Sequence, residues 1–123
     1  MPRVLLVGKD ESLLRTRCAI VARTGAEVLC ASPDEVLSNR QIDPVDVLVI
    51  CHTLRQEERQ EFTAGLRERW RGVWIIQLAK FEIETRLPAS HADEVVVAAK
   101  PAQLIGRIRA ALQKVGEEEE QIR

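Results

Sequence analysis

A thiol and an imidazole stand side by side at the end of the most apolar run of the chain. Residues 46–50 lead directly into Cys51 and His52. A thiolate is a nucleophile and a soft metal ligand, so redox chemistry or metal binding is one interpretation of Cys51. Metal sites need three or four ligands, however, and no other candidates cluster nearby in the sequence. We therefore expect Cys51 to pack as a small hydrophobe, with a redox or metal-binding role as the alternative.

Two lysines follow other apolar runs and could act together with this thiol. Lys9 comes after the first run and Lys100 after the last one. If both approach Cys51, their ammonium groups could bind an anion such as phosphate or sulfate and lower the pKa of the thiol. Lys9 could instead pair with Asp10 and hold its loop in one state, or simply face solvent. The sequence leaves these alternatives open.

Composition argues against several classes of partner. The chain has 123 residues, of which 46% are hydrophobic and 30% charged, and its net charge is −1. This fits a single domain and provides no field to attract nucleic acid or an anionic membrane surface. Aromatic residues make up only 3%, which disfavours base stacking. No segment has the layout of a signal peptide or a membrane span.

The cysteines favour a reducing compartment. There are three of them, Cys18, Cys30 and Cys51, and no CxxC pair occurs. An odd number without that spacing argues against a disulfide framework or a zinc site. We therefore expect three free thiols in apolar surroundings, no metal or other cofactor, and a cytoplasmic location.

Short apolar runs alternate with helical patterns along the whole chain. This alternation predicts successive βα units around a parallel sheet, and the nearly continuous apolar character of the runs predicts helices on both faces. We expect strands at residues 3–7, 27–31, 46–51, 73–78 and 94–99.

Capping residues and glycines mark the expected helix boundaries. Ser32, Pro33 and Glu35 have the spacing of a helix cap, a first-turn proline and a capping-box partner. Residues 81–90 predict only a weak helix, because proline and β-branched residues interrupt them. The other expected starts are Ser12, Thr53 with Gln56, and Pro101, and the expected ends are Gly25, Gly72 and Gly116.

The elements together predict a three-layer, doubly wound α/β fold with a five-stranded parallel sheet. We expect one domain at residues 1–116 and a frayed acidic tail at residues 117–123. In doubly wound sheets the functional site lies at the carboxyl ends of the strands. The residues there are Gly8, Lys9, Asp10, Cys51, His52, Leu78, Ala79, Lys80 and Lys100.

These strand ends make residues 3 to about 115 resemble the receiver domain of bacterial response regulators. Lys100-Pro101 matches the Lys-Pro pair that follows the fifth strand in that family, and residues 92–94 resemble its Gly-Ala-Asp. The resemblance implies the strand order 2-1-3-4-5 with about five helices. The peptide bond at this position is often cis in that family, so the resemblance implies a cis Lys100–Pro101 bond. The residues alone predict a fixed turn before the last helix.

The positions that carry the chemistry depart from the family pattern. The acidic pair that holds magnesium reads Gly8-Lys9, with Asp10 one step later, and Cys51 stands where the phosphoacceptor aspartate is expected. Leu78 replaces the hydroxyl residue that moves on phosphorylation. A thiol cannot form an aspartyl phosphate, and a lysine repels the divalent cation that the reaction requires.

The resemblance therefore implies an atypical, stand-alone receiver domain of a two-component network that is not an enzyme. Its partner would be another signalling protein, a kinase or an output protein, bound independently of phosphorylation. A homodimer through the fourth helix, fifth strand and fifth helix is a further option. The alternative is an anion or small-molecule sensor built on Lys9, Cys51 and Lys100. A flavodoxin-like enzyme is a third interpretation, but the chain lacks a glycine-rich phosphate loop.

Overall fold

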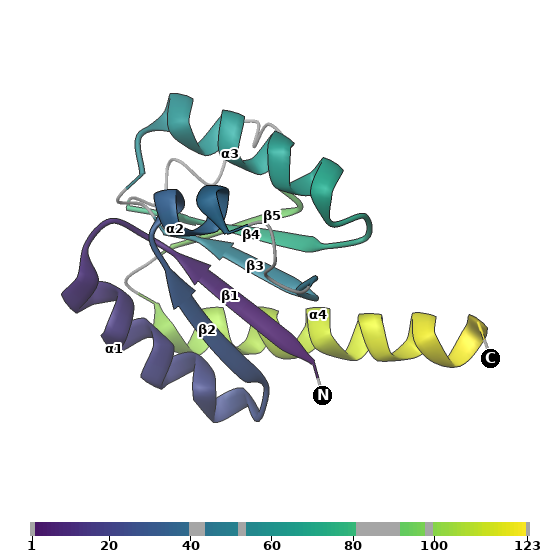
Figure 1. The fold of residues 1–123 in the computed structure, drawn as a ribbon. Helices are drawn as coiled ribbons and strands as arrows, with labels where there is room; N and C mark the ends of the chain where they lie inside the picture. The colour runs from purple at the N-terminus through teal and green to yellow at the C-terminus, as the bar shows by residue number, and fades with distance from the viewer. Residues whose placement is uncertain (1, 40–43, 52–53, 81–91, 98–99, 123) are drawn as a thin grey trace.

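A parallel sheet runs through the centre of the molecule (Figure 1). The computed structural model describes residues 2–39, 44–51, 54–80, 92–97 and 100–122. Within these residues the sheet has five strands in the order β2-β1-β3-β4-β5, which confirms the predicted fold class and strand order. The strands are β1 (Arg3–Val7), β2 (Glu27–Ala31), β3 (Val47–Ile50), β4 (Trp74–Ala79) and β5 (Glu94–Val97).

Four α-helices are present in the described residues, against about five expected. They are α1 (Glu11–Val21), which continues into the 3-10 turn η1 (Ala22–Thr24), α2 (Pro33–Ser38), α3 (Gln56–Arg69) and α4 (Pro101–Ile122). The weak helix predicted at residues 81–90 lies outside the described residues, as do residues 98–99 at the end of the last predicted strand.

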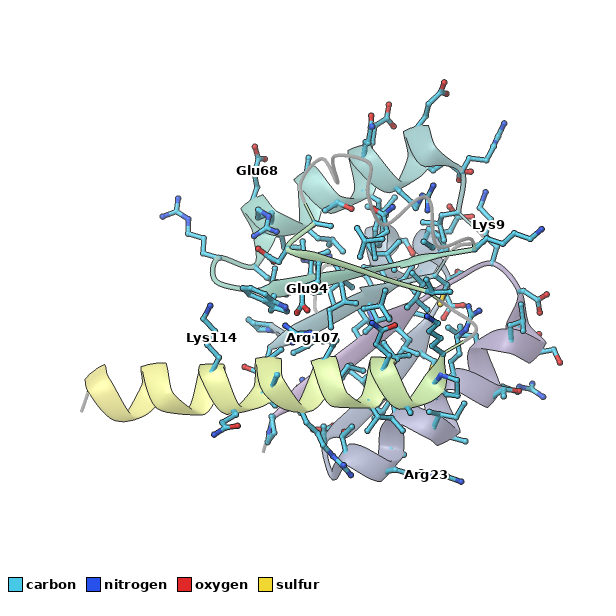
Figure 2. All side chains as sticks on the ribbon, turned by 180° about the vertical axis from the view of Figure 1, so that it is seen from behind. Lys9, Arg23, Glu68, Glu94, Arg107 and Lys114 are labelled. Carbon is cyan, nitrogen blue, oxygen red and sulfur yellow. A yellow bond between two sulfur atoms is a disulfide. The ribbon has the colours of Figure 1, made fainter. Side chains whose placement is uncertain are left out.

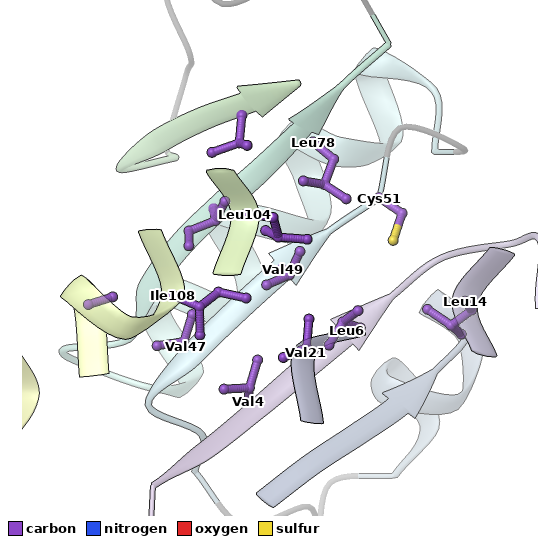
Figure 3. Packing of buried hydrophobic residues seen from close by; sticks show 13 residues of the cluster. Val4, Leu6, Leu14, Val21, Val47, Val49, Cys51, Leu78, Leu104 and Ile108 are labelled. Atoms are coloured by element: carbon purple, nitrogen blue, oxygen red, sulfur yellow. The ribbon is translucent and has the colours of Figure 1, made fainter. Parts of the chain in front are cut away.

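The helices cover both faces of the sheet, as the apolar strands predicted. Helices α1 and α4 pack on one face, where Val4 and Leu6 of β1 belong to the same buried cluster as Ile108 of α4 (Figure 3). Helices α2 and α3 pack on the other face, where Leu5 of β1 and Phe62 of α3 belong to a second buried cluster. The alternation along β1 follows from the two-residue period of a strand. The sheet is therefore buried on both sides and leaves its carboxyl edge for a site.

The strand register brings three predicted site positions to one edge. Val7 pairs with Ile50, and Ile50 pairs with Gln77. Gly8, Cys51 and Leu78 are the residues that follow these three partners in the sequence. They consequently stand at the same level of β1, β3 and β4.

The first helix begins at a different residue from the one expected. The cap of α1 is Asp10, whose side-chain Oδ1 accepts a hydrogen bond from the backbone N–H of Leu13 at 3.1 Å. The expectation of Ser12 was wrong, because Asp10 is also a strong capping residue and stands directly after the strand. Ser32 caps α2 as predicted, accepting from the N–H of Glu35 at 3.2 Å.

The expected end of the last helix was also wrong. Helix α4 passes through Gly116 and continues to Ile122, so its C-terminal part projects past the sheet in Figure 1. A helical glycine costs only about 1 kcal/mol relative to alanine, and the glutamates that follow are good helix formers. At the start of α3 the Glu58 carboxylate accepts a hydrogen bond from the backbone N–H of Arg55 at 3.4 Å, while the expected cap Thr53 lies outside the described residues. Among the described residues no peptide bond is cis, so the Lys100–Pro101 bond is trans.

Two cysteines expected as free thiols are joined in the structure. Cys18 on α1 and Cys30 on β2 form a disulfide with a Cα–Cα distance of 6.8 Å. The packing of α1 against β2 brings together residues that are 12 positions apart, which no local spacing rule detects. Cys51 remains a free, buried cysteine. The odd cysteine count is thus explained by one pair and one single thiol.

Candidate functional site

Cys51 sits at the end of β3 with its side chain in the core. Only 1% of the residue is exposed, and it belongs to the apolar cluster between the sheet and helices α1 and α4 (Figure 3). Its N–H donates to the carbonyl of Val7 at 2.9 Å, and its own carbonyl accepts from the N–H of Leu54 at 3.4 Å. The packing role expected for Cys51 agrees with this burial.

Arg17 lies beside this thiol, a position that the sequence patterns did not indicate. It lies on α1 with only 8% of its surface exposed, and its side chain hydrogen-bonds the thiol of Cys51. Burial raises the pKa of Cys51 above its ordinary value, and the hydrogen bond and charge of Arg17 act in the opposite direction. The net shift is upward, so the thiol stays protonated and is a poor nucleophile at neutral pH.

A signal for Arg17 was present in the sequence. Leu14, Arg17 and Val21 follow one another at helical spacing and are all buried. A charged residue on the inward stripe of a helix needs a polar partner in the core, because burying an isolated charge is costly. The identity of that partner depends on how α1 packs, which the sequence pattern does not contain.

Lys9 reaches across the carboxyl edge to helix α3. Its Nζ lies 2.6 Å from Oε2 and 2.7 Å from Oε1 of Glu58, and Arg55 contacts the same carboxylate at 3.1 Å. Figure 2 shows Lys9 at this edge of the molecule. The hydrogen bond from Lys9, followed by the one from Arg55, lowers the pKa of Glu58 below its ordinary value. The ammonium of Lys9 therefore links the loop after β1 to the first turn of α3.

Among the remaining predicted positions, Gly8, Leu78 and Ala79 are buried in the sheet or at its edge. Gly8 is buried and donates its N–H to the carbonyl of Ala31 at 3.3 Å, which ties the ends of β1 and β2 together. Leu78 and Ala79 are fully buried in β4. Lys100 is exposed, and its carbonyl accepts the N–H of Leu104 at the start of α4. His52, another strand-end residue, lies outside the described residues.

The described part of the chain offers no obvious metal site. No group of three or more His, Cys, Asp or Glu side chains in it is arranged to hold an ion. A hollow of about 460 Å³ opens beside Gly8, between α1 and α2. Its described lining includes Lys9 and the disulfide-bonded Cys30 but neither Cys51 nor Lys100. The three residues of the proposed anion site are therefore not gathered around this hollow.

Solved structures identify the fold. No family model and no curated protein matches the chain. A response regulator receiver domain protein from Methanospirillum hungatei is 21% identical with a TM-score of 0.76, covering 96% of this chain and 98% of that chain. The chain has the receiver fold.

Other solved structures with this fold lie at similar distances. The response regulator TrrA of Thermotoga maritima, solved in complex with Mg²⁺ and BeF, is 19% identical with a TM-score of 0.75, covering 90% of this chain and 99% of that one. An uncharacterized protein from Neptuniibacter caesariensis is 12% identical with a TM-score of 0.80, covering 99% and 95%. Sequence identities this low establish the receiver fold and leave the activity to the site.

Among the residues that the structure describes, no helix is both long and apolar enough to cross a bilayer.

Proposed function

We propose that this chain is an atypical receiver domain of two-component signalling that binds other proteins and is not switched by aspartyl phosphorylation. It is not an enzyme in this proposal. In this proposal residues 1–116 form the interaction domain and residues 117–123 form an acidic tail, of which residues 117–122 continue α4.

The observation that carries the proposal is the state of the residue at the end of β3. Cys51 stands there, 1% exposed and hydrogen-bonded by Arg17. Phosphoryl transfer to a receiver requires an ionised carboxylate that meets a divalent cation and the donor. A buried thiol with a raised pKa and a neighbouring guanidinium meets none of these requirements.

The surrounding residues support the same conclusion. Lys9 holds an ion pair with Glu58, and the Asp10 carboxylate is engaged as the cap of α1. A cation bound beside Lys9 would be repelled by its ammonium group. Leu78, buried at the level of Cys51, has no hydroxyl with which to follow a phosphoryl group.

The partner in this proposal is a kinase or an output protein. The fold is kept while the chemical positions are changed, so surfaces for binding proteins remain available. The face of β5 and α4 is one such surface: Glu94 contacts Arg107 there and accepts from Trp74 Nε1 at 2.5 Å, and Lys114 lies 4.6 Å from the Trp74 ring centroid (Figure 2). A homodimer through this face is part of the proposal.

The proposal places the domain in the cytoplasm. A thiol-reducing environment there would open the Cys18–Cys30 disulfide, because cytosolic disulfides are kept reduced. The sensor alternative built on Lys9, Cys51 and Lys100 has less support, since Lys9 is engaged by Glu58 and Cys51 by Arg17.

A phosphoryl mimic tests the proposal. We would record ¹H–¹⁵N spectra of the labelled protein during titration with Mg²⁺ and beryllofluoride, and measure binding of a captured partner with and without them. We expect no saturable shift in the residues around Cys51 and an unchanged partner affinity. Saturable shifts at Gly8, Cys51 and Leu78, with a changed affinity, would overturn the proposal.

A further inference from the structure

A groove separates helices α2 and α3 on the face of the sheet away from α4. Its volume is about 350 Å³. Figure 1 shows the two helices on the same side of the sheet. The described residues that line the groove are Pro33, Asp34 and Leu37 of α2, Leu54 before α3, and Glu58, Glu61 and Phe62 of α3.

The floor and one wall of this groove are apolar. Leu54 and Phe62 are buried beneath it, at 2% and 5% exposure. Leu37 stands at its side and is 56% exposed, more than Leu13, the other large hydrophobic residue that is exposed among the side chains the structure describes. A protruding leucine beside a hollow with an apolar floor is an arrangement that a bulky side chain of a partner can fill.

The rim of the groove is acidic. Asp34, Glu58 and Glu61 line it, and Glu58 already binds Lys9 and Arg55. Within the part of the chain that the structure describes, Asp34 and Glu61 form no side-chain ion pair. These two exposed carboxylates favour a basic partner and repel acidic ones, including nucleic acid.

We propose that the α2–α3 groove binds a segment of a partner protein in which bulky apolar side chains are flanked by lysine or arginine. The apolar side chains enter between Leu37 and Phe62, and the basic residues meet Asp34 and Glu61. This is the helix-in-groove mode of peptide recognition. The proposal rests on the interaction role proposed above and assigns that role a surface and a partner chemistry.

The test uses a synthetic probe, a fluorescent amphipathic peptide with leucines on one face and arginines flanking them. We expect saturable binding by fluorescence anisotropy that weakens as salt concentration rises. Leu37→Ser and Glu61→Lys should each weaken it about tenfold. The matched controls are Leu13→Ser on α1 and Glu68→Lys further along α3, which should leave the affinity within about twofold.

Chemical-shift mapping supplies the location. We expect shifts at residues 33–37 and 54–62 on peptide addition. Absence of saturable binding, equal losses in groove and control variants, or shifts confined to other elements would overturn the inference. Self-association that Leu37→Ser abolishes in light scattering would also overturn it, by making a second copy the occupant.

These outcomes can be separated from failure of the proposed function. The peptide experiment contains no phosphodonor or beryllofluoride, so its result does not depend on the chemistry at Cys51. If the peptide does not bind the groove, while a partner binds elsewhere with an affinity that beryllofluoride does not change, only the groove inference is overturned. A response to beryllofluoride defeats the proposed function, whatever the peptide does.

Discussion

Arg17 of α1 hydrogen-bonds the thiol of Cys51 at the end of β3, and less than a tenth of either residue is exposed. A buried guanidinium thus lies beside the position where the resemblance to receivers implied an acceptor carboxylate. The pair joins α1 to the centre of the sheet. It is an interaction within the core, and its consequences can be measured through stability.

We expect stability to fall at alkaline pH because of Cys51. Its folded pKa is raised, so the unfolded chain loses the thiol proton first as the pH rises. The contribution of the Cys51 thiol to the free energy of unfolding is fully present below about pH 8.5 and is lost as the pH rises through the folded pKa. Urea unfolding at several alkaline pH values measures the decline. Cys51→Ala should show a shallower one, and an equal slope in both proteins would contradict the assignment.

The cap of the first helix gives a second prediction. Asp10→Ala removes the acceptor for the N–H of Leu13 and should lower the free energy of unfolding by about 1 kcal/mol. Ser12→Ala is the matched control and should change it by less than about 0.5 kcal/mol. Urea denaturation of both variants at neutral pH distinguishes the two positions. A larger loss for Ser12→Ala would restore the boundary that the sequence suggested.

The disulfide gives a third prediction. Without reductant, the double variant Cys18→Ser, Cys30→Ser should be less stable than the parent by about 2–4 kcal/mol. With reductant the difference should shrink, because the parent then has no cross-link. Mass spectrometry after alkylation of the native, reduced protein should find two modified cysteines, with Cys51 protected until unfolding. Alkylation of Cys51 before Cys18 and Cys30 would contradict the structure.

Restoring the carboxylate should not restore the chemistry. In Cys51→Asp the new side chain faces Arg17 and the core, while Lys9 still occupies the neighbouring loop. We expect no phosphoryl adduct by intact mass with Mg²⁺ and a small phosphodonor. Lys9→Asp combined with Cys51→Asp should increase magnesium affinity in calorimetry over either single variant. Efficient phosphorylation of Cys51→Asp alone would mean that Lys9 is no obstacle.

The sheet could be predicted because its information is local. Each buried strand is a short apolar run, and Ser32 with Pro33 carries its own cap signal. The partners of Lys9 and Arg17 could not be predicted, since both lie on other elements: Glu58 is 49 positions from Lys9. The Cys18–Cys30 disulfide could not be predicted for the same reason, because its two cysteines lie on different elements. The position of Cys51 at the sheet edge followed from the strand pattern, and its burial was expected.

The central claim is that this receiver fold takes no phosphoryl group on aspartate. Intact mass measurement after incubation with a small phosphodonor and Mg²⁺ tests it most directly. We expect an unchanged mass. A single, acid-stable phosphoryl adduct that peptide mapping places on Asp10 or Asp46 would contradict the account and make the domain a switch with a relocated acceptor.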